Sequence, residues 1–286
     1  SMAELWRGAP AAEALSLRAS AQAEELRAAG ITPTLAIVRV GERAEDLSYE
    51  RGAVRRCEGT GVAVERFVLA QDAAQEELTD LLRRINGDRR IHGCLLLRPL
   101  PRQMDENAVC AVLAPEKDID GITPGSLAGV FTGSGAGFPP CTAQACMELL
   151  AHYGFDPAGK RAVVVGRSLV VGRPAAMLLM GQNATVTICH TKTANLAEEC
   201  RRGDILLAAA GQPELIKAEH VRPGAVVLDV GIHSVDGKLT GDVESAAAEP
   251  VAGAITPVPG GVGAVTTCVL ALHVIQAARR QNGLET

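Results

Sequence analysis

The stretch "VVVGRSLVVGRP" (163–174) decides the fold class, because it is typical of a strand, a tight turn and the start of a helix. Gly166 allows the sharp turn, Ser168 can cap the helix, and Gly172 lets the helix pack closely on the strand. The free N–H groups at such a helix start attract a pyrophosphate. The spacing is G-x-S-x-x-x-G rather than G-x-G-x-x-G, so a dinucleotide site and a βα turn without a ligand both remain open.

The end of the next expected strand, in "TVTICHTKT" (185–193), bears on which dinucleotide would bind. An NAD site tends to place Asp or Glu there for the ribose hydroxyls, whereas this segment carries Thr191 and Lys192. Arg167 adds a permanent charge that can pair with a 2′-phosphate. Lys192 alone would be taken as a solvated lysine, but together with Arg167 it favours NADP over NAD.

Strands alternate with helices along the chain, which predicts parallel βαβ units. Expected strands cover residues 34–41, 62–69, 91–97, 161–166, 185–189, 204–210 and 225–231. Expected helices cover residues 11–29, the Tyr49 segment up to 61, 73–88, 104–115, 143–154, a segment from Pro174, 193–202 and a long C-terminal segment.

A stretch rich in Gly, Ser and Pro (125–142) interrupts this pattern and marks a domain boundary. We therefore expect two α/β domains with mostly parallel sheets. The first covers residues 1–139 and is rejoined by a C-terminal helix at 264–286. The second, residues 140–263, is Rossmann-type.

Composition excludes several classes of protein. Hydrophobic residues make up 47% of the chain and aromatic residues 2%, so the core must be aliphatic. The net charge of -5 offers no basic field for nucleic acid. No apolar run reaches the length of a membrane span. The eight cysteines form no C-x-x-C pair, which favours reduced thiols in a cytoplasmic protein and no metal site.

Two further Gly-rich or Pro-rich loops stand at the expected ends of elements: "LDVGIHS" (228–234) and "TPVPGGVGAVTT" (256–267). Either alone could be a strained turn. Together with the turn at 166–172 they indicate a cleft, in which a cofactor ring could pass over the backbone at Gly231 and Ile232.

These segments together resemble the methylenetetrahydrofolate dehydrogenase/methenyltetrahydrofolate cyclohydrolase family (FolD-like), over essentially the whole chain. The segments that carry the resemblance are "PEKDIDGITPGSLAG" (115–129), "PPCTAQACMELL" (139–150), "VVVGRSLVVGRP", "CHTKTANL" (189–196), "RPGAVVLDVGI" (222–232), "GKLTGDV" (237–243) and "ITPVPGGVGAVTT" (255–267).

The resemblance implies two α/β domains with a folate cleft between them, NADP on the second domain, and a homodimer formed through that domain. It also implies a reaction. The dehydrogenase step moves a hydride from 5,10-methylenetetrahydrofolate to the nicotinamide, and many members then hydrolyse the methenyl product to 10-formyltetrahydrofolate.

The same resemblance implies the site residues. Cofactor-binding positions are Gly166, Arg167, Ser168, Gly172, Thr191, Ile232, Gly263 and Thr266. Substrate-side positions are Tyr49, Ala53, Leu96, Leu97, Asp120, Pro259 and Gly260. Tyr49 and Asp120 would be the catalytic pair, and the Asp120 carboxylate would accept hydrogen bonds from the pterin.

Two positions depart from the family pattern. The family has a lysine four residues after the tyrosine, where this chain has Ala53, and a glutamine where it has Leu97. A lysine with an adjustable pKa can handle the proton released by water addition, and no lysine precedes Lys117. Arg55 is a poor replacement, because a guanidinium is effectively never deprotonated. We therefore expect a dehydrogenase with weak or absent cyclohydrolase activity.

Two alternatives remain. The chain could be a full bifunctional enzyme that uses Asp46 or His92 as the base. It could instead be a catalytically silent nucleotide-binding or folate-binding protein, which would bind NADP but form no NADPH.

Overall fold

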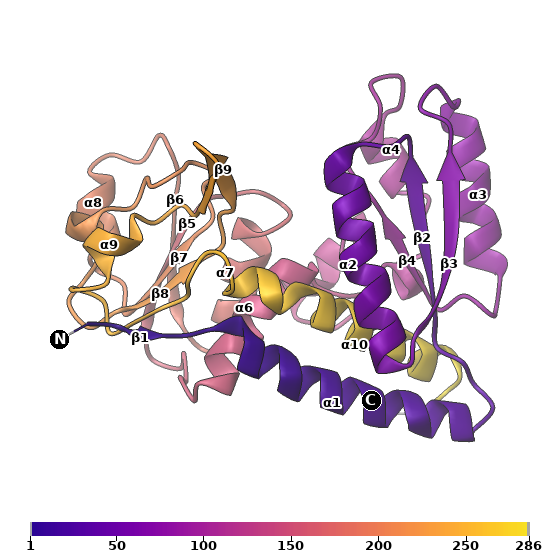
Figure 1. The fold of residues 1–286 in the computed structure, drawn as a ribbon, viewed down its shortest axis with the longest axis horizontal. Helices are drawn as coiled ribbons and strands as arrows, with labels where there is room; N and C mark the ends of the chain where they lie inside the picture. Colours follow the sequence, from indigo (N-terminus) through magenta and orange to yellow (C-terminus); the bar gives the residue numbers. More distant parts are fainter. Residues whose placement is uncertain (1, 285–286) are drawn as a thin grey trace. The chain divides into compact units, whose positions relative to one another are not determined.

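Two parallel sheets organise the chain, one in each of two compact units (Figure 1). The computed structural model describes residues 2–284. The three-stranded unit comprises residues 14–141 and 267–284, and the six-stranded unit comprises residues 2–13 and 142–266. The expected α/β class with parallel sheets is thereby confirmed.

The three-stranded unit is built around β2 (Thr34–Val40), which pairs in parallel with β3 (Ala63–Leu69) on one side and β4 (Gly93–Leu96) on the other. Strand β2 is almost entirely buried, as a central parallel strand requires. Its helices are α1 (Gly8–Ala28, which begins in the other unit), α2 (Ala44–Thr60), α3 (Gln75–Gly87), α4 (Glu106–Cys110), α5 (Pro124–Thr132) and α10 (Thr266–Gln281), with a 3-10 turn η1 (Pro115–Lys117).

Helix α5 overlaps the Gly-rich, Ser-rich and Pro-rich stretch (125–142) that marks the expected domain boundary, where the sequence pattern predicts no helix. Its first turn is capped by Thr123, whose Oγ1 accepts the N–H of Ser126 at 3.1 Å, and Pro124 occupies the first turn. Gly133 ends it with a φ of 73°. Capping therefore outweighs composition here, because both ends of a short helix are satisfied locally.

The six-stranded sheet has the order β1-β11-β8-β7-β5-β6. Its strands are β1 (Glu4–Leu5), β5 (Arg161–Val165), β6 (Thr185–Cys189), β7 (Ile205–Ala208), β8 (Val226–Asp229) and β11 (Ala254–Ile255). The remaining elements are α6 (Cys141–His152), α7 (Gly172–Gly181), α8 (Leu196–Cys200), α9 (Ser245–Ala248), the turns η2 (Ala218–His220) and η3 (Val262–Ala264), and an antiparallel hairpin of β9 (His233–Val235) and β10 (Lys238–Thr240).

The N-terminal segment differs from the expected division, which placed it in the first domain. Strand β1 pairs in parallel with β11, and the Trp6 N–H donates to the Ile255 carbonyl at 2.8 Å. The Gly8 N–H donates to Gly260 at 2.8 Å. These bonds attach residues 2–13 to the six-stranded unit; a two-residue strand leaves too little pattern to be found from sequence.

The segment Val262–Gln281, which contains α10, is long and apolar enough to cross a membrane by length and composition, contrary to the sequence-based expectation. However, 72% of its most apolar window is buried inside the protein, as in the core helix of a soluble protein. Cys268, Leu270, Ala271, Val274 and Ile275 are all fully buried. The apolar composition therefore reflects core packing.

Candidate functional site

The eight expected cofactor positions lie in the segments that follow parallel strands of the six-stranded sheet, either in loops or at the first turns of the helices that come next. Four of them follow β5, Thr191 follows β6, Ile232 follows β8, and the segment with Gly263 and Thr266 follows β11. Because the carboxyl ends of parallel strands meet at one edge, the loops converge there. Strands β6 and β7 flank β5 on opposite sides, so this edge includes the point where the strand order reverses.

The β5–α7 turn is tight, because it has no room for side chains at two positions. Gly166 has a φ of 126°, and a Cβ there would lie 2.1 Å from the Ala209 carbonyl oxygen. A Cβ on Gly172 would lie 2.2 Å from the Gly166 carbonyl oxygen. The Ser168 hydroxyl accepts the N–H of Val171 at 3.1 Å, so the turn leads directly into α7.

Basic groups surround this turn. Arg167 and Lys192 are both exposed. Arg173, which the sequence reading did not single out, donates from Nε to the Arg167 carbonyl at 2.8 Å and braces the turn. The Lys192 N–H donates to His190 Nδ1 at 3.1 Å, so the loop that carries Thr191 is also held by its own side chains. The guanidinium and ammonium groups suit a 2′-phosphate.

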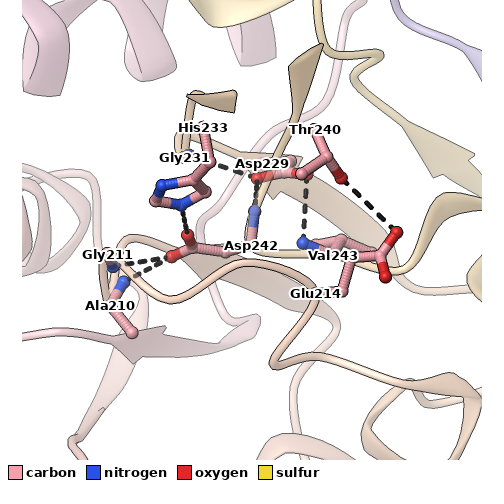
Figure 2. A network of polar contacts seen from close by, with 9 residues as sticks. All are labelled: Ala210, Gly211, Glu214, Asp229, Gly231, His233, Thr240, Asp242 and Val243. Atoms are coloured by element: carbon pink, nitrogen blue, oxygen red, sulfur yellow. Dashed lines mark hydrogen bonds and ion pairs between the residues drawn. The ribbon is translucent and has the colours of Figure 1, made fainter. Parts of the chain in front are cut away.

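Two buried carboxylates hold the loop that contains Ile232 (Figure 2). Asp229, at the end of β8, accepts the N–H groups of Gly231 at 3.2 Å, Asp242 at 2.9 Å and Val243 at 3.2 Å. Burial raises the pKa of Asp229 to about 7, and the neighbouring Asp242 charge also raises it, while these N–H groups oppose the rise.

Asp242 is 0% exposed and connects further segments. It accepts the N–H groups of Ala210 at 2.6 Å and Gly211 at 3.0 Å, and its Oδ1 lies 2.7 Å from His233 Nε2 (Figure 2). Sequence reasoning missed this network. Its residues come from three separate loops, and only the motif "GKLTGDV" hinted at it.

In the three-stranded unit, Tyr49, Ala53 and Cys57 share one face of α2, because they are spaced four residues apart. Ala53 and Cys57 are both 0% exposed, whereas Tyr49 is half-buried. Burial raises the pKa of Tyr49 well above its ordinary value, and the nearby Asp120 charge adds to the effect. The phenol is therefore protonated at neutral pH and can donate a hydrogen bond.

Asp120 lies near the Tyr49 phenol and is half-buried. Burial raises the pKa of the Asp120 carboxyl to about 6, and the Asp118 charge also raises it. Two groups of Cys141 lower this pKa: its thiol, and its backbone N–H, which donates to Asp120 Oδ1 at 3.4 Å. Asp118 shapes this loop by accepting the N–H groups of Ile122 at 2.9 Å and Thr123 at 2.8 Å. The carboxylate that the resemblance assigns to the pterin is thus held by its own loop.

Cys141 and His273 are both buried beside Asp120, but they form no reactive dyad. His273 Nδ1 lies 2.7 Å from the Ile119 carbonyl and 3.7 Å from the Cys141 sulfur. Burial lowers the pKa of His273 to about 4, so its neutral ring donates to the carbonyl. Burial also raises the pKa of the Cys141 thiol, which therefore is not a nucleophile.

Leu96 and Leu97 are 2% and 6% exposed, and the Leu97 N–H donates to the Val38 carbonyl at 3.0 Å, which extends the ladder past β4. Lys117, the first lysine of the chain, directs its ammonium to the Ile85 and Asp88 carbonyls at 2.6 Å each. It caps the end of α3 and is not available to the Asp120 site.

The two candidate replacement bases differ in position. Asp46 is 5% exposed, lies three residues before Tyr49 on α2, and has a pKa raised by burial. His92 precedes β4, at the opposite end of that strand from Leu97. Its Nδ1 accepts the Thr34 N–H at 3.1 Å, which makes it part of the structure of the sheet.

The remaining substrate-side positions, Pro259 and Gly260, belong to the six-stranded unit, in the loop after β11. Gly260 has a φ of 93°, and its Cβ position meets open space. The structure therefore places the expected folate-side residues on both units.

Comparison with known proteins gives two family matches that together span most of the chain. Residues 6–120 match the catalytic domain of the tetrahydrofolate dehydrogenase/cyclohydrolase family, and residues 140–282 match its NAD(P)-binding domain. The "Bifunctional protein FolD" of Carboxydothermus hydrogenoformans is 48% identical over 286 residues, covering 99% of this chain and 100% of the relative.

Solved structures agree. The crystal structure of the bifunctional FolD enzyme from Campylobacter jejuni matches with a TM-score of 0.94 and 33% identity, covering 96% of this chain and 98% of that one. The Trypanosoma brucei dehydrogenase-cyclohydrolase, solved with NADP and an inhibitor, matches with a TM-score of 0.92 and 33% identity, covering 98% of both chains.

Proposed function

Because the chain belongs to the tetrahydrofolate dehydrogenase/cyclohydrolase family, we propose that it oxidises 5,10-methylenetetrahydrofolate to 5,10-methenyltetrahydrofolate with NADP, and that its cyclohydrolase activity is weak or absent. The proposal of weak or absent cyclohydrolase activity rests on Ala53. This residue is fully buried one turn after Tyr49, at the position where the family has its lysine.

The hydride step depends on positioning more than on proton transfer. NADP, when bound, supplies the hydride acceptor. Gly166 and Gly172 allow the tight turn whose helix start would receive its pyrophosphate, Arg167 and Lys192 suit its 2′-phosphate, and the loop at Ile232 is held by the Gly231 N–H bond to Asp229. Tyr49 and Asp120 would orient the pterin by donating and accepting hydrogen bonds, respectively.

The hydrolysis step needs a group that takes a proton from water. One and two turns after Tyr49 on α2, the groups are the methyl of Ala53 and the Cys57 thiol, whose pKa burial raises to about 12; one turn before it lies Asp46, whose carboxyl is the base of the second candidate function. The Lys117 ammonium is bound to two carbonyls of another element. We therefore assign to this chain the hydride step alone.

The test is a pair of assays on the purified protein. NADPH formation from methylenetetrahydrofolate measures the dehydrogenase. Loss of the near-ultraviolet absorbance of methenyltetrahydrofolate, with a bifunctional family member alongside, measures the cyclohydrolase. We expect NADPH formation and no enzyme-dependent decay. Decay at the rate of the bifunctional member would contradict the proposal.

The full bifunctional enzyme is the second candidate, favoured by the names of the relatives and by the position of Asp46 on the same helix as Tyr49. It predicts decay that Asp46→Asn abolishes. His92 is the weaker base, because it lies at the far end of β4 from Leu97. A silent binding protein would bind NADP and form no NADPH; the retained cofactor loops argue against it.

We also propose a cytoplasmic homodimer. Strand β6 is last in the sheet order, and among the described residues its outer edge has no partner strand. Ile188 on this strand is 40% exposed and Met180 on α7 is 51% exposed, which suits pairing of two edges. Among the described residues the eight cysteines form no disulfide with one another, as in a reducing compartment. Light scattering should show a dimer, and Ile188→Lys should weaken it.

A further inference from the structure

The β9–β10 hairpin brings the segments that contain Gly231 and Gly241 so close together that neither glycine has room for a Cβ. Thr240 pairs with His233, so the chain returns to the loop that it left at Gly231. A Cβ on Gly231 would lie 2.2 Å from Asp242 Oδ1, and a Cβ on Gly241 would lie 2.0 Å from Asp229 Oδ2. Each glycine therefore packs directly against the buried carboxylate of the other segment.

Ile232 is restrained on both sides by these carboxylates. The Gly231 N–H before it donates to Asp229, and the His233 ring after it bonds to Asp242 at 2.7 Å (Figure 2). Its own side chain is 56% exposed, although a Cβ on Gly263 would touch its Cδ1 at 3.2 Å. An exposed apolar side chain on a backbone that is held on both sides is preorganised for contact with a ligand.

Asp242 also holds a second loop. The N–H groups of Ala210 and Gly211, which follow β7, both donate to its Oδ2. The loops after β7 and β8 are therefore tied to one carboxylate at the edge of the sheet where the cofactor positions converge. Moving Asp242 would displace both loops together.

We propose that His233 and Asp242 are positioning residues for NADP, and that their hydrogen bond forms a clasp that sets the place of Ile232 in the cofactor site. The inference rests on the proposed NADP site. The His233 ring is the part of the clasp that can be altered separately, because Asp242 keeps its backbone donors when His233 is changed. Hydrogen bonds to charged groups are strong enough for their loss to be measured in affinity.

The experiment compares three variants by the dissociation constant for NADP in titration calorimetry. His233→Leu removes the donor and should weaken binding at least about tenfold. His233→Asn retains a donor amide and should recover most of the affinity. His152→Leu is the control, since His152 is an exposed histidine whose ring makes a T-shaped contact with Tyr153. The KM for methylenetetrahydrofolate should stay constant in all three.

A double-mutant cycle tests the bond itself. If His233 acts through Asp242, adding His233→Leu to Asp242→Ala, which leaves no acceptor for the ring, should weaken NADP binding no further. Wild-type affinity in His233→Leu, equal losses in His233→Leu and His233→Asn, or parallel rises in the folate KM would each overturn the inference. If His233→Leu does not fold, His233→Ser takes its place, and its dissociation constant for NADP is compared with that of the wild type in the same way. A wild-type protein that binds NADP but forms no NADPH would refute the proposed function. The dissociation constants of the His233 variants for NADP, relative to that of the wild type, would still test the inference.

Discussion

A Cβ on Gly8 would lie 2.1 Å from the carbonyl oxygen of Gly261, so the N-terminal segment packs against the Pro-Gly loop without room for a methyl group. The Gly8 N–H donates to the neighbouring Gly260 carbonyl at 2.8 Å. The loop that carries Pro259 and Gly260 is therefore held by the start of the chain.

We predict that Gly8→Ala displaces this loop. The free energy of unfolding should fall by about 1–3 kcal/mol, the usual cost of forcing atoms into a packed site, and dehydrogenase kcat/KM should fall with it. Trp6 stacks on Tyr153 with ring centroids 4.8 Å apart and is the only tryptophan, so its fluorescence reports the change. Gly181→Ala, at the end of α7 where a Cβ meets open space, is the control; it should lower neither the free energy of unfolding nor kcat/KM and should leave the fluorescence unaltered.

The missing lysine can be put back. Ala53→Lys combined with Leu97→Gln should create enzyme-dependent decay of methenyltetrahydrofolate at least about 100-fold above the wild-type rate, the lower range of general-base catalysis. Thermal melting should show a loss of stability, because both positions are buried. Arg55→Lys places a lysine on the exposed side of the same helix and should give no decay. Equal decay in both proteins would contradict the assignment.

Cofactor choice should depend on Arg167. Replacing it with alanine should lower the NADP-over-NAD ratio of kcat/KM at least about tenfold, because a charge-assisted bond to the 2′-phosphate is lost while NAD lacks that group. Arg161→Ala removes an exposed arginine from the opposite end of β5 and should keep the wild-type ratio. An unchanged ratio in Arg167→Ala would place phosphate recognition elsewhere.

The pKa of Asp120, raised by burial to about 6, predicts a pH dependence of folate use. Its ionised form accepts pterin N–H groups, so kcat/KM for methylenetetrahydrofolate should fall as the pH drops below about 6, while the dissociation constant for NADP stays constant. Asp120→Asn should lower kcat/KM and remove this limb of the profile. A limb that persists in the variant would assign the titration to another group.

The same pKa predicts that Asp120 lowers stability at neutral pH. Because the carboxyl binds its proton more tightly folded than unfolded, stability falls as the pH rises from about 4 to about 6 and then levels off. Asp120→Asn should therefore melt at a higher temperature than wild type at pH 7, and the difference should vanish near pH 4. Glu13→Gln, on the exposed surface of α1, should show no such difference.

The sequence alone determined the elements that local signals specify. The turn at Gly166 and the β-branched strand before it depend on residues adjacent in the chain, and the structure confirms β5 and α7 there. The absence of a lysine at Ala53 could likewise be read by counting from Tyr49. Helix α5 was missed, although Thr123 and Gly133 could have marked its ends.

Only the tertiary structure decided the features that join distant segments. Strands β1 and β11 have two residues each; β1 is defined by its pairing with β11, and β11 by its pairing with β1 and β8. His233 and Asp242 meet because the β9–β10 hairpin closes between them. Capping and periodicity act over a few residues and leave a pattern in the sequence. The donors to a buried carboxylate such as Asp242 come from separate loops, so they are set only when the fold brings those loops together.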